Sequence, residues 1–128
     1  MALSPPLPPL RRQPTDAELL HAVQRRAFAF FFSESHPETG LTKDRARNTG
    51  SERDDYTVCS IASTGYALAA LPVGVERGWV GRTAAYRRAL ATLRFLHDRL
   101  PHVHGFCYHF VDWRTGARSG WGGPRQAG

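Results

Sequence analysis

Four aspartates could supply the paired carboxylates that glycoside hydrolysis requires, one as acid and one as base or nucleophile. They are Asp44, Asp54, Asp55 and Asp112. The first three lie in a charged stretch. Exposure to solvent is sufficient to explain the two that are adjacent in sequence, Asp54 and Asp55. Asp112 is better placed, because it follows an aromatic segment and lies beside Trp113. Aromatic faces next to a carboxylate suit a sugar, but they equally suit a hairpin over a core, so the residues alone leave both interpretations open.

The densest group of possible metal ligands is formed by His102, His104, Cys107 and His109. Imidazole and thiolate both bind zinc. In a strand, however, alternate side chains face opposite ways, so the first two residues would be separated from the last two. The spacing matches no established ligand pattern. We therefore expect neither a metal nor any other cofactor.

The two cysteines could each be nucleophiles, but their surroundings favour structural roles. Cys59 lies in an alanine-rich segment that we expect to be a buried helix, and a buried thiol far from a base is inert. Cys107 and His109 would be about 7 Å apart on the same face of an extended segment. Two cysteines are also too few for a disulfide framework.

The composition describes one globular domain or part of a larger one. The chain has 128 residues, of which 41% are hydrophobic and 22% charged, which excludes a disordered tail. No apolar run approaches the roughly 20 residues that a membrane-spanning helix needs, so we expect no membrane association.

The formal charge of +6 is spread along the chain rather than concentrated. Of the 17 basic residues 16 are arginine, and they occur from Arg11 to Arg125, with Lys43 the only lysine. A nucleic-acid surface usually gathers its charge on one face or in one tract. We therefore expect no nucleic-acid partner. A basic binder of that kind would lose affinity steeply with salt.

Three helices are predicted from apolar periodicity. The first starts at a capping box formed by Thr15 and Glu18 and carries a wide apolar stripe, which indicates more than one packing neighbour. The members of this stripe are Leu20, Val23, Ala27, Phe28, Phe30, Phe31 and Phe32. The second is expected over residues 57–71 with Pro72 as its stop, and the third from a Thr83 cap until Pro101 ends it.

The remaining segments are expected to be irregular or extended. Residues 36–40 have the composition of a turn, and the charged stretch that continues to residue 55 is either functional or disordered. Phe106, Tyr108 and Phe110 alternate with other residues as in one strand, with a hairpin turn at residues 114–116. The N-terminal segment has proline where a signal peptide would be apolar, so we expect a cytoplasmic protein.

Several stretches together resemble one bacterial family, the glucoamylase-like (glycoamylase-like) domain family. They are residues 24–32 (QRRAFAFFF), 36–45 (HPETGLTKDR), 59–70 (CSIASTGYALAA), 73–80 (VGVERGWV), 92–96 (TLRFL) and 104–118 (HGFCYHFVDWRTGAR). The resemblance implies a mainly α-helical (α/α)6 toroid, here represented by its first helices and a short aromatic β-hairpin near the C-terminus. It also implies glucan-active relatives, including some that act on β-1,2-glucans.

By this resemblance, five residues would bind a glucan or oligosaccharide at the mouth of the toroid. They are Asp44, Arg45, Tyr108, His109 and Asp112. Residues 15–118 would form the N-terminal part of the domain, between a disordered Pro-rich lead (1–14) and a divergent Gly/Pro-rich tail (119–128). The acidic segments that family members carry further on have no counterpart here, so we assign no catalytic residue.

The sequence therefore predicts a truncated N-terminal fragment of a glucan-active glycoside hydrolase-like protein. Three helices are a quarter of such a toroid, so we expect an exposed apolar surface and an inactive chain. The alternative is a small helical module that binds a carbohydrate or a protein.

Overall fold

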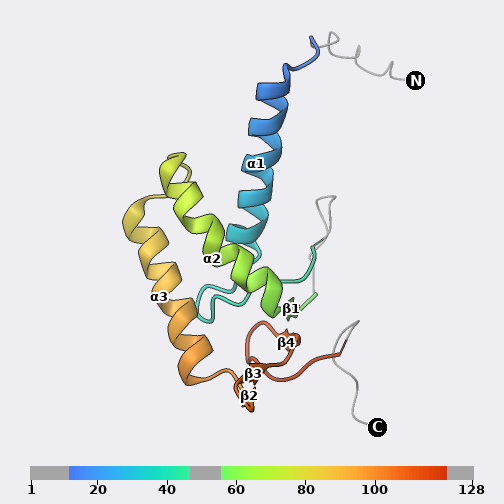
Figure 1. Cartoon of the computed structure of the whole chain (residues 1–128), viewed down its shortest axis with the longest axis vertical. Coiled ribbons are helices and arrows are strands. Elements are labelled where there is room, and N and C mark those ends of the chain that lie inside the picture. The colour runs from blue at the N-terminus through green and yellow to red at the C-terminus, as the bar shows by residue number, and fades with distance from the viewer. Residues whose placement is uncertain (1–11, 47–55, 121–128) are drawn as a thin grey trace, which may run out of the picture.

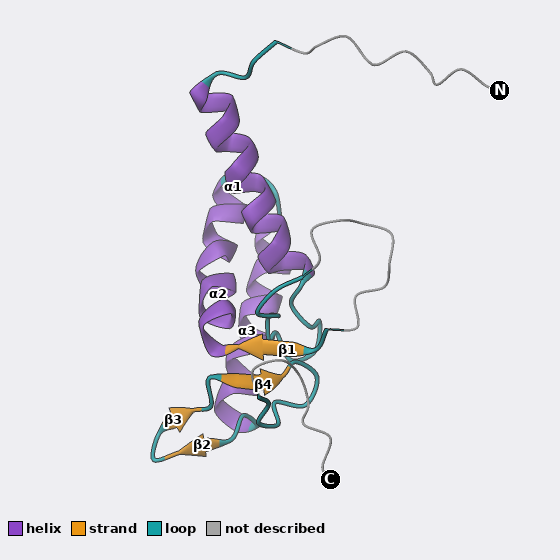
Figure 2. Cartoon of the chain, turned by 90° about the vertical axis from the view of Figure 1, so that its right-hand side faces the viewer, coloured by secondary structure: helices purple, strands orange, loops and turns teal. Residues whose placement is uncertain are grey.

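The computed structural model describes residues 12–46 and 56–120. It contains three helices, α1 (Asp16–Ser33), α2 (Ile61–Glu76) and α3 (Arg82–Asp98), and four short strands, β1 (Val58–Ser60), β2 (His102–Val103), β3 (Phe106–Cys107) and β4 (Phe110–Asp112). The strands lie beside the start of α2 and the end of α3, and α1 extends away from them (Figures 1 and 2). The mainly helical class with a small hairpin is thus confirmed. Most of the Pro-rich lead (1–11), residues 47–55 and most of the tail (121–128) lie outside the described residues.

The start of α1 is the predicted capping box. The Glu18 backbone N–H donates to Thr15 Oγ1 at 3.3 Å, and the Thr15 backbone N–H donates to Glu18 Oε2 at 2.8 Å. Arg12 pairs with the same carboxylate at 2.6 Å. This guanidinium, followed by the bonds from Thr15, holds the pKa of Glu18 below its ordinary value.

Helix α2 differs from its prediction at both ends. Residues 58–60 form β1 because they pair with β4, and Ser60 then caps the helix by accepting from the Ser63 N–H at 3.0 Å. The helix also continues through Pro72 to Glu76. Pro72 removes one backbone hydrogen bond and crowds the preceding turn, but the helix continues past it, and Gly74 in its last turn is buried. Any Cβ at Gly74 would collide with the ring of Phe28, so the glycine permits this close approach.

Helix α3 begins one residue before the predicted Thr83 cap. Gly81 is the N-cap residue and makes no side-chain capping bond. The helix ends at Asp98, and Leu100 then enters the core, where only 3% of it is exposed. The shift at each end is the usual error of a periodicity argument.

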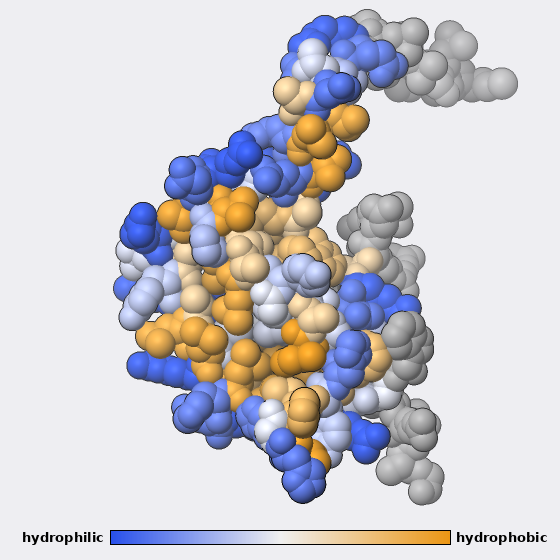
Figure 3. All heavy atoms as spheres, in the orientation of Figure 1, coloured by the Kyte–Doolittle hydropathy of each residue, from blue (hydrophilic) through white to orange (hydrophobic). Residues whose placement is uncertain are grey.

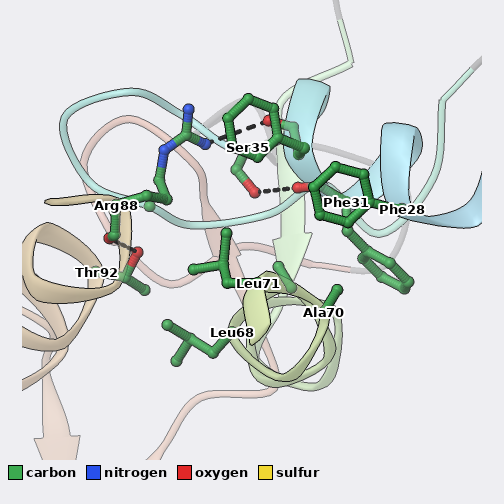
Figure 4. Close-up of a pocket in the computed structure, with 11 residues that line it drawn as sticks. Phe28, Phe31, Ser35, Leu68, Ala70, Leu71, Arg88 and Thr92 are labelled. Carbon is green, nitrogen blue, oxygen red and sulfur yellow. Dashed lines mark hydrogen bonds between the residues drawn. The ribbon is translucent and has the colours of Figure 1, made fainter. Parts of the chain in front are cut away.

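The three helices meet around a small enclosed space between α1, α2 and α3 (Figure 4). Phe28 and Leu71 line it, and Arg88 closes one side by donating to the Phe32 carbonyl at 3.3 Å. The space has a volume of about 10 Å³, which is close to the minimum for a single water molecule. It is therefore a packing junction and cannot hold a sugar.

Only one side of the wide apolar surface of α1 is packed. Phe28 and His21 lie against Trp79, with ring centroids 5.5 Å and 5.7 Å away, and Phe28 stacks on Phe32. In contrast, residues 12–27 are all exposed. Among the described residues, the C-terminal half of α1 packs against α2 and contacts α3 through Arg88, whereas its N-terminal half stays exposed.

None of the helices that the structure describes combines the length and the apolarity needed to cross a membrane.

Candidate functional site

Four extended segments lie side by side next to the first turn of α2, and we call them the strand ladder. Its members are residues 42–44, β1, β4 and residues 117–118. One row across the ladder runs from Lys43 through Cys59 and Val111 to Arg118. The next row runs from Asp44, whose N–H donates to the Val58 carbonyl at 3.0 Å, through Val58 to Asp112. Segments far apart in the sequence are thus brought into register.

The row through Cys59 faces the core. Cys59 and Val111 are completely buried and pack with Leu41, Phe95 and Leu100. The Cys59 thiol donates to the Val111 carbonyl with a separation of 3.2 Å. Burial, reinforced by the negative charge of Asp112, raises the pKa of Cys59 to about 12. The thiol is therefore protonated and inert, as expected, although it lies on a strand and not on a helix.

The row through Val58 carries the two aspartates of interest. Residues in one row lie on the same face of a sheet, and neighbouring strands are spaced by about 4.8 Å. The Cα atoms of Asp44 and Asp112, with β1 between them, are thus about 10 Å apart. Both side chains are half-buried. The ladder therefore brings together two of the five predicted site residues.

Asp112 also holds the turn that follows it. Its Oδ1 accepts from the Arg114 and Thr115 N–H groups at 3.0 Å each and from Thr115 Oγ1 at 3.1 Å. Gly116 closes the turn at a φ of 74°, so the predicted turn at residues 114–116 is confirmed. Oδ2 makes no hydrogen bond with the described residues. This arrangement suits a carboxylate that accepts hydrogen bonds better than one that donates a proton.

Arg45 lies next to Asp44 and is exposed. Its guanidinium lies 5.0 Å from the centre of the Tyr56 ring, which places a cation on an aromatic face beside β1. A stacked guanidinium keeps its planar set of N–H donors available to a ligand.

The aromatic segment is not the single strand that its alternation predicts. Pairing stops between β3 and β4, at Tyr108 and His109. Tyr108 packs against the core with the Arg118 guanidinium 5.0 Å from its ring centre. His109 is exposed and lies edge-on to Phe110 at 4.3 Å. The structure therefore does not place the Tyr108 ring on the face that carries the aspartates.

Three members of the histidine and cysteine cluster lie on the hairpin formed by β2 and β3, whereas His109 lies beyond it. His102 lies opposite Cys107, whereas strand alternation had put them on opposite faces, and His104 occupies the turn at a φ of 51°. Within residues 12–46 and 56–120, no three such side chains gather as a metal site would require.

Lys43, on the edge segment of the ladder, is the centre of a buried cluster that the sequence does not predict. Lys43 is only 4% exposed; its Nζ is 3.0 Å from Glu34 Oε2 and 4.6 Å from the centre of the Trp113 ring. Thr39 Oγ1 donates to the Trp113 carbonyl at 2.6 Å. The only sign of this cluster in the sequence is that Lys43 is the single lysine of an otherwise arginine-rich chain. The cluster fixes the segment that carries Asp44.

Comparison with known proteins identifies the relatives of this fold. The chain is 31% identical over 114 residues to an exo-β-1,2-glucooligosaccharide sophorohydrolase of Parabacteroides distasonis, a match that covers 89% of this chain and 15% of that protein. No family model matches the chain.

Solved structures give the same result. A glucoamylase-like protein of Bacteroides uniformis superposes with a TM-score of 0.69 at 34% identity, covering 83% of this chain and 24% of that one. A β-1,2-glucanase of Parabacteroides distasonis superposes with a TM-score of 0.70 at 27% identity, covering 88% of this chain and 15% of that one.

The class defined by these matches is that of carbohydrate-active proteins. More specifically, the homologues and structural neighbours of this chain are glucoamylase-like and β-1,2-glucanase proteins, which confirms the resemblance seen in the sequence. The chain spans about a quarter or less of the length of these relatives.

Proposed function

We propose that this chain forms the N-terminal part of a glucan-active glycoside hydrolase-like domain and contributes to glucan binding without carrying out catalysis alone. The substrate class is a β-1,2-glucan or its oligosaccharides. Of the five residues predicted from the sequence, Asp44, Arg45 and Asp112 would contact the ligand and the exposed His109 would lie near it, whereas Tyr108 would act only by holding the hairpin against the core.

The observation that carries this proposal is the shared row of Asp44 and Asp112 across β1. Two half-buried carboxylates on one face, separated by the buried Val58, would accept hydrogen bonds from hydroxyls of successive glucose units, and the exposed Arg45 would donate beside Asp44. Protein sites for polar ligands combine a few fixed polar groups of this kind with an apolar surround. The relatives act on glucans, which gives the pattern its substrate class.

Catalysis requires more than this row supplies. An acid must hold a proton and a second carboxylate must act as base or nucleophile, whereas Asp112 Oδ1 is occupied by three donors from the turn. The proposal therefore places the catalytic pair in the part of the domain that lies outside these 128 residues. The cytoplasmic location expected from the sequence remains part of the proposal.

Titration with a β-1,2-glucooligosaccharide, followed by amide NMR shifts, tests the binding role. We expect millimolar affinity with shifts centred on the ladder, and no hydrolysis. Asp44→Asn and Asp112→Asn should each weaken binding about tenfold, because a charged hydrogen bond is worth roughly 1.5 kcal/mol. Asparagine at position 112 keeps the Oδ1 acceptor, so the turn is retained.

Asp98→Asn is the matched control, because Asp98 is exposed on α3 and pairs only with its neighbour His97 among the described residues. Turnover by the chain itself would contradict the inactive role. Binding that neither aspartate variant weakens would contradict the site. Glucan binding together with a cooperative melt as a monomer would favour the alternative, a self-sufficient binding module, over part of a larger domain.

A further inference from the structure

The ammonium group of Lys43 lies inside the protein, whereas the described arginines lie mostly at its surface. Only 4% of Lys43 is exposed, while every described arginine except the half-buried Arg88 is exposed. Figure 3 shows hydrophilic side chains over much of the surface. Taking an ammonium group out of water is costly unless it is paired, so the contacts that compensate Lys43 indicate its role.

Two of these contacts join separate parts of the chain. The Lys43 Nζ lies 3.0 Å from Oε2 of Glu34, the C-cap residue of α1, and 4.6 Å from the centre of the Trp113 ring. Lys43 belongs to the edge segment on one side of β1. Trp113 follows β4 on the other side, where its backbone N–H donates to the Thr57 carbonyl at 2.9 Å. The contact between Lys43 and Trp113 therefore passes across β1.

This contact lies on the opposite face of the ladder from the two aspartates. Lys43 shares a row with the core residue Val111. Trp113, two residues after Val111, faces the same way and packs against the core. Asp44 directly follows Lys43, and Asp112 directly precedes Trp113. The contact thus joins the immediate neighbours of both aspartates.

The same contact determines how the Trp113 ring is oriented. The indole N–H is buried and has no hydrogen-bond partner among the described residues, although a buried tryptophan N–H usually has one. The ring is instead held by the Lys43 ammonium on its face and by the perpendicular His36 ring, with centroids 5.0 Å apart. The attraction of a cation to an aromatic face strengthens when both are withdrawn from water.

We propose that Lys43 is a positioning residue of the glucan site. Its ammonium group holds Trp113 across β1 and so sets the separation of Asp44 and Asp112 on the other face, although Lys43 itself contacts no ligand. The proposal rests on the proposed function for the identity of the ligand. It accounts for a lysine at a position where an apolar side chain of similar length would avoid the cost of burying a charge.

A double-mutant cycle on the whole chain tests this role. Lys43→Met keeps the length and the apolar stem of the side chain but removes the ammonium, and Trp113→Leu removes the aromatic face. Each change should weaken binding of a β-1,2-glucooligosaccharide, followed by amide NMR, about fivefold, and the two together should weaken it no more than either alone. Lys43→Arg keeps the cation and should remain closer to the unaltered chain. Additive losses, or an unchanged affinity in Lys43→Met, would overturn the proposal.

Amide hydrogen exchange without ligand separates positioning from a general loss of stability. In Lys43→Met the Asp44 and Trp113 amides, which donate to carbonyls of residues 58 and 57, should exchange about fivefold faster. The Ile61 amide, which donates to the His109 carbonyl, should not change. Equal acceleration of all three amides would show a purely structural role and overturn the proposal. Should Lys43→Met not fold, Glu34→Gln removes the paired charge at a side chain that is 28% exposed and carries the same exchange test.

Arg99→Met is the matched control, because it removes an exposed cation from the face of another core ring, that of Phe95, at 5.6 Å. Arg99 is the C-cap residue of α3 and lies outside the ladder, so the change should alter neither glucan affinity nor the exchange of the Asp44 amide. Absence of glucan binding by the unaltered chain would contradict the proposed function. The exchange rates would then still decide whether Lys43 positions the aspartates.

Discussion

The strand ladder and the N-terminal half of α1 are held by opposite kinds of interaction. On the core side of the ladder, Leu41 packs with Cys59 and Val111, and all three are completely buried although they come from three separate segments. At the N-terminal end of α1, residues 12–27 are all exposed, and the side-chain hydrogen bonds seen there are local, joining Arg12, Thr15 and Glu18.

This difference shows where stability resides in the chain. Burial of apolar surface is the main favourable term in folding, and short helices in water are marginal without packing. The ladder end therefore supplies the stability of the described structure. The end of α1 that extends from it should open at little cost, unless another polypeptide covers it.

A pair of leucine truncations tests this comparison most directly. Leu41→Ala should lower the free energy of unfolding by about 3 to 4 kcal/mol, because it leaves a cavity in a fully packed site. Leu20→Ala should change it by less than about 0.5 kcal/mol, because the side chain is exposed. Urea denaturation of the two variants measures both values. Similar losses at the two positions would mean that α1 is packed in solution.

The raised pKa of Cys59 predicts a smaller, pH-dependent effect in the ladder. The thiol ionises at an ordinary pKa of 9.0 in the unfolded chain and at about 12 in the folded one. Between these values the unfolded state binds fewer protons, so stability falls as pH rises, by up to about 1.4 kcal/mol per pH unit. Below pH 9 this contribution to stability is fully present and does not change with pH.

Urea denaturation at pH 8.5 and 10.5 measures this slope, and Cys59→Ala is the control that should remove it. A slope that persists unchanged in the variant belongs to other groups. Thiol-specific labelling of the native chain gives a second reading, because half-buried Cys107 should react well before completely buried Cys59.

The smallest effect is expected at the capping box. Thr15→Ala removes a cap worth about 1 kcal/mol to a helix, but it acts on a half-helix that is already weakly coupled to the core. Hydrogen exchange of amides in residues 19–24 should accelerate about fivefold, while the urea midpoint stays within error. A clear loss of global stability would show that the two regions unfold together.

The sequence was most informative where structure depends on near neighbours. The capping box at Thr15, the turn at residues 36–40 and the turn at residues 114–116 were all correctly predicted, because each is specified by residues within four positions of one another. The existence of the three helices followed from apolar periodicity in the same way.

The errors share a cause in non-local pairing. The alanine-rich context of Cys59 predicts a helix, whereas pairing with β4 makes it a strand residue. Tyr108 was assigned to one continuous strand, but its ring packs on the core instead. The neighbours of Asp44 in the ladder likewise come from segments up to about seventy residues away, and periodicity contains no information about such partners.

The burial of Lys43 has a practical consequence for chemical modification. It is the single lysine of the chain, and its ammonium group is enclosed by Glu34 and Trp113. Amine-directed reagents should therefore label the native protein at the α-amino group alone and acylate a second amine only when the ladder opens. Mass counting of the added groups would then report opening of this region without any engineered probe.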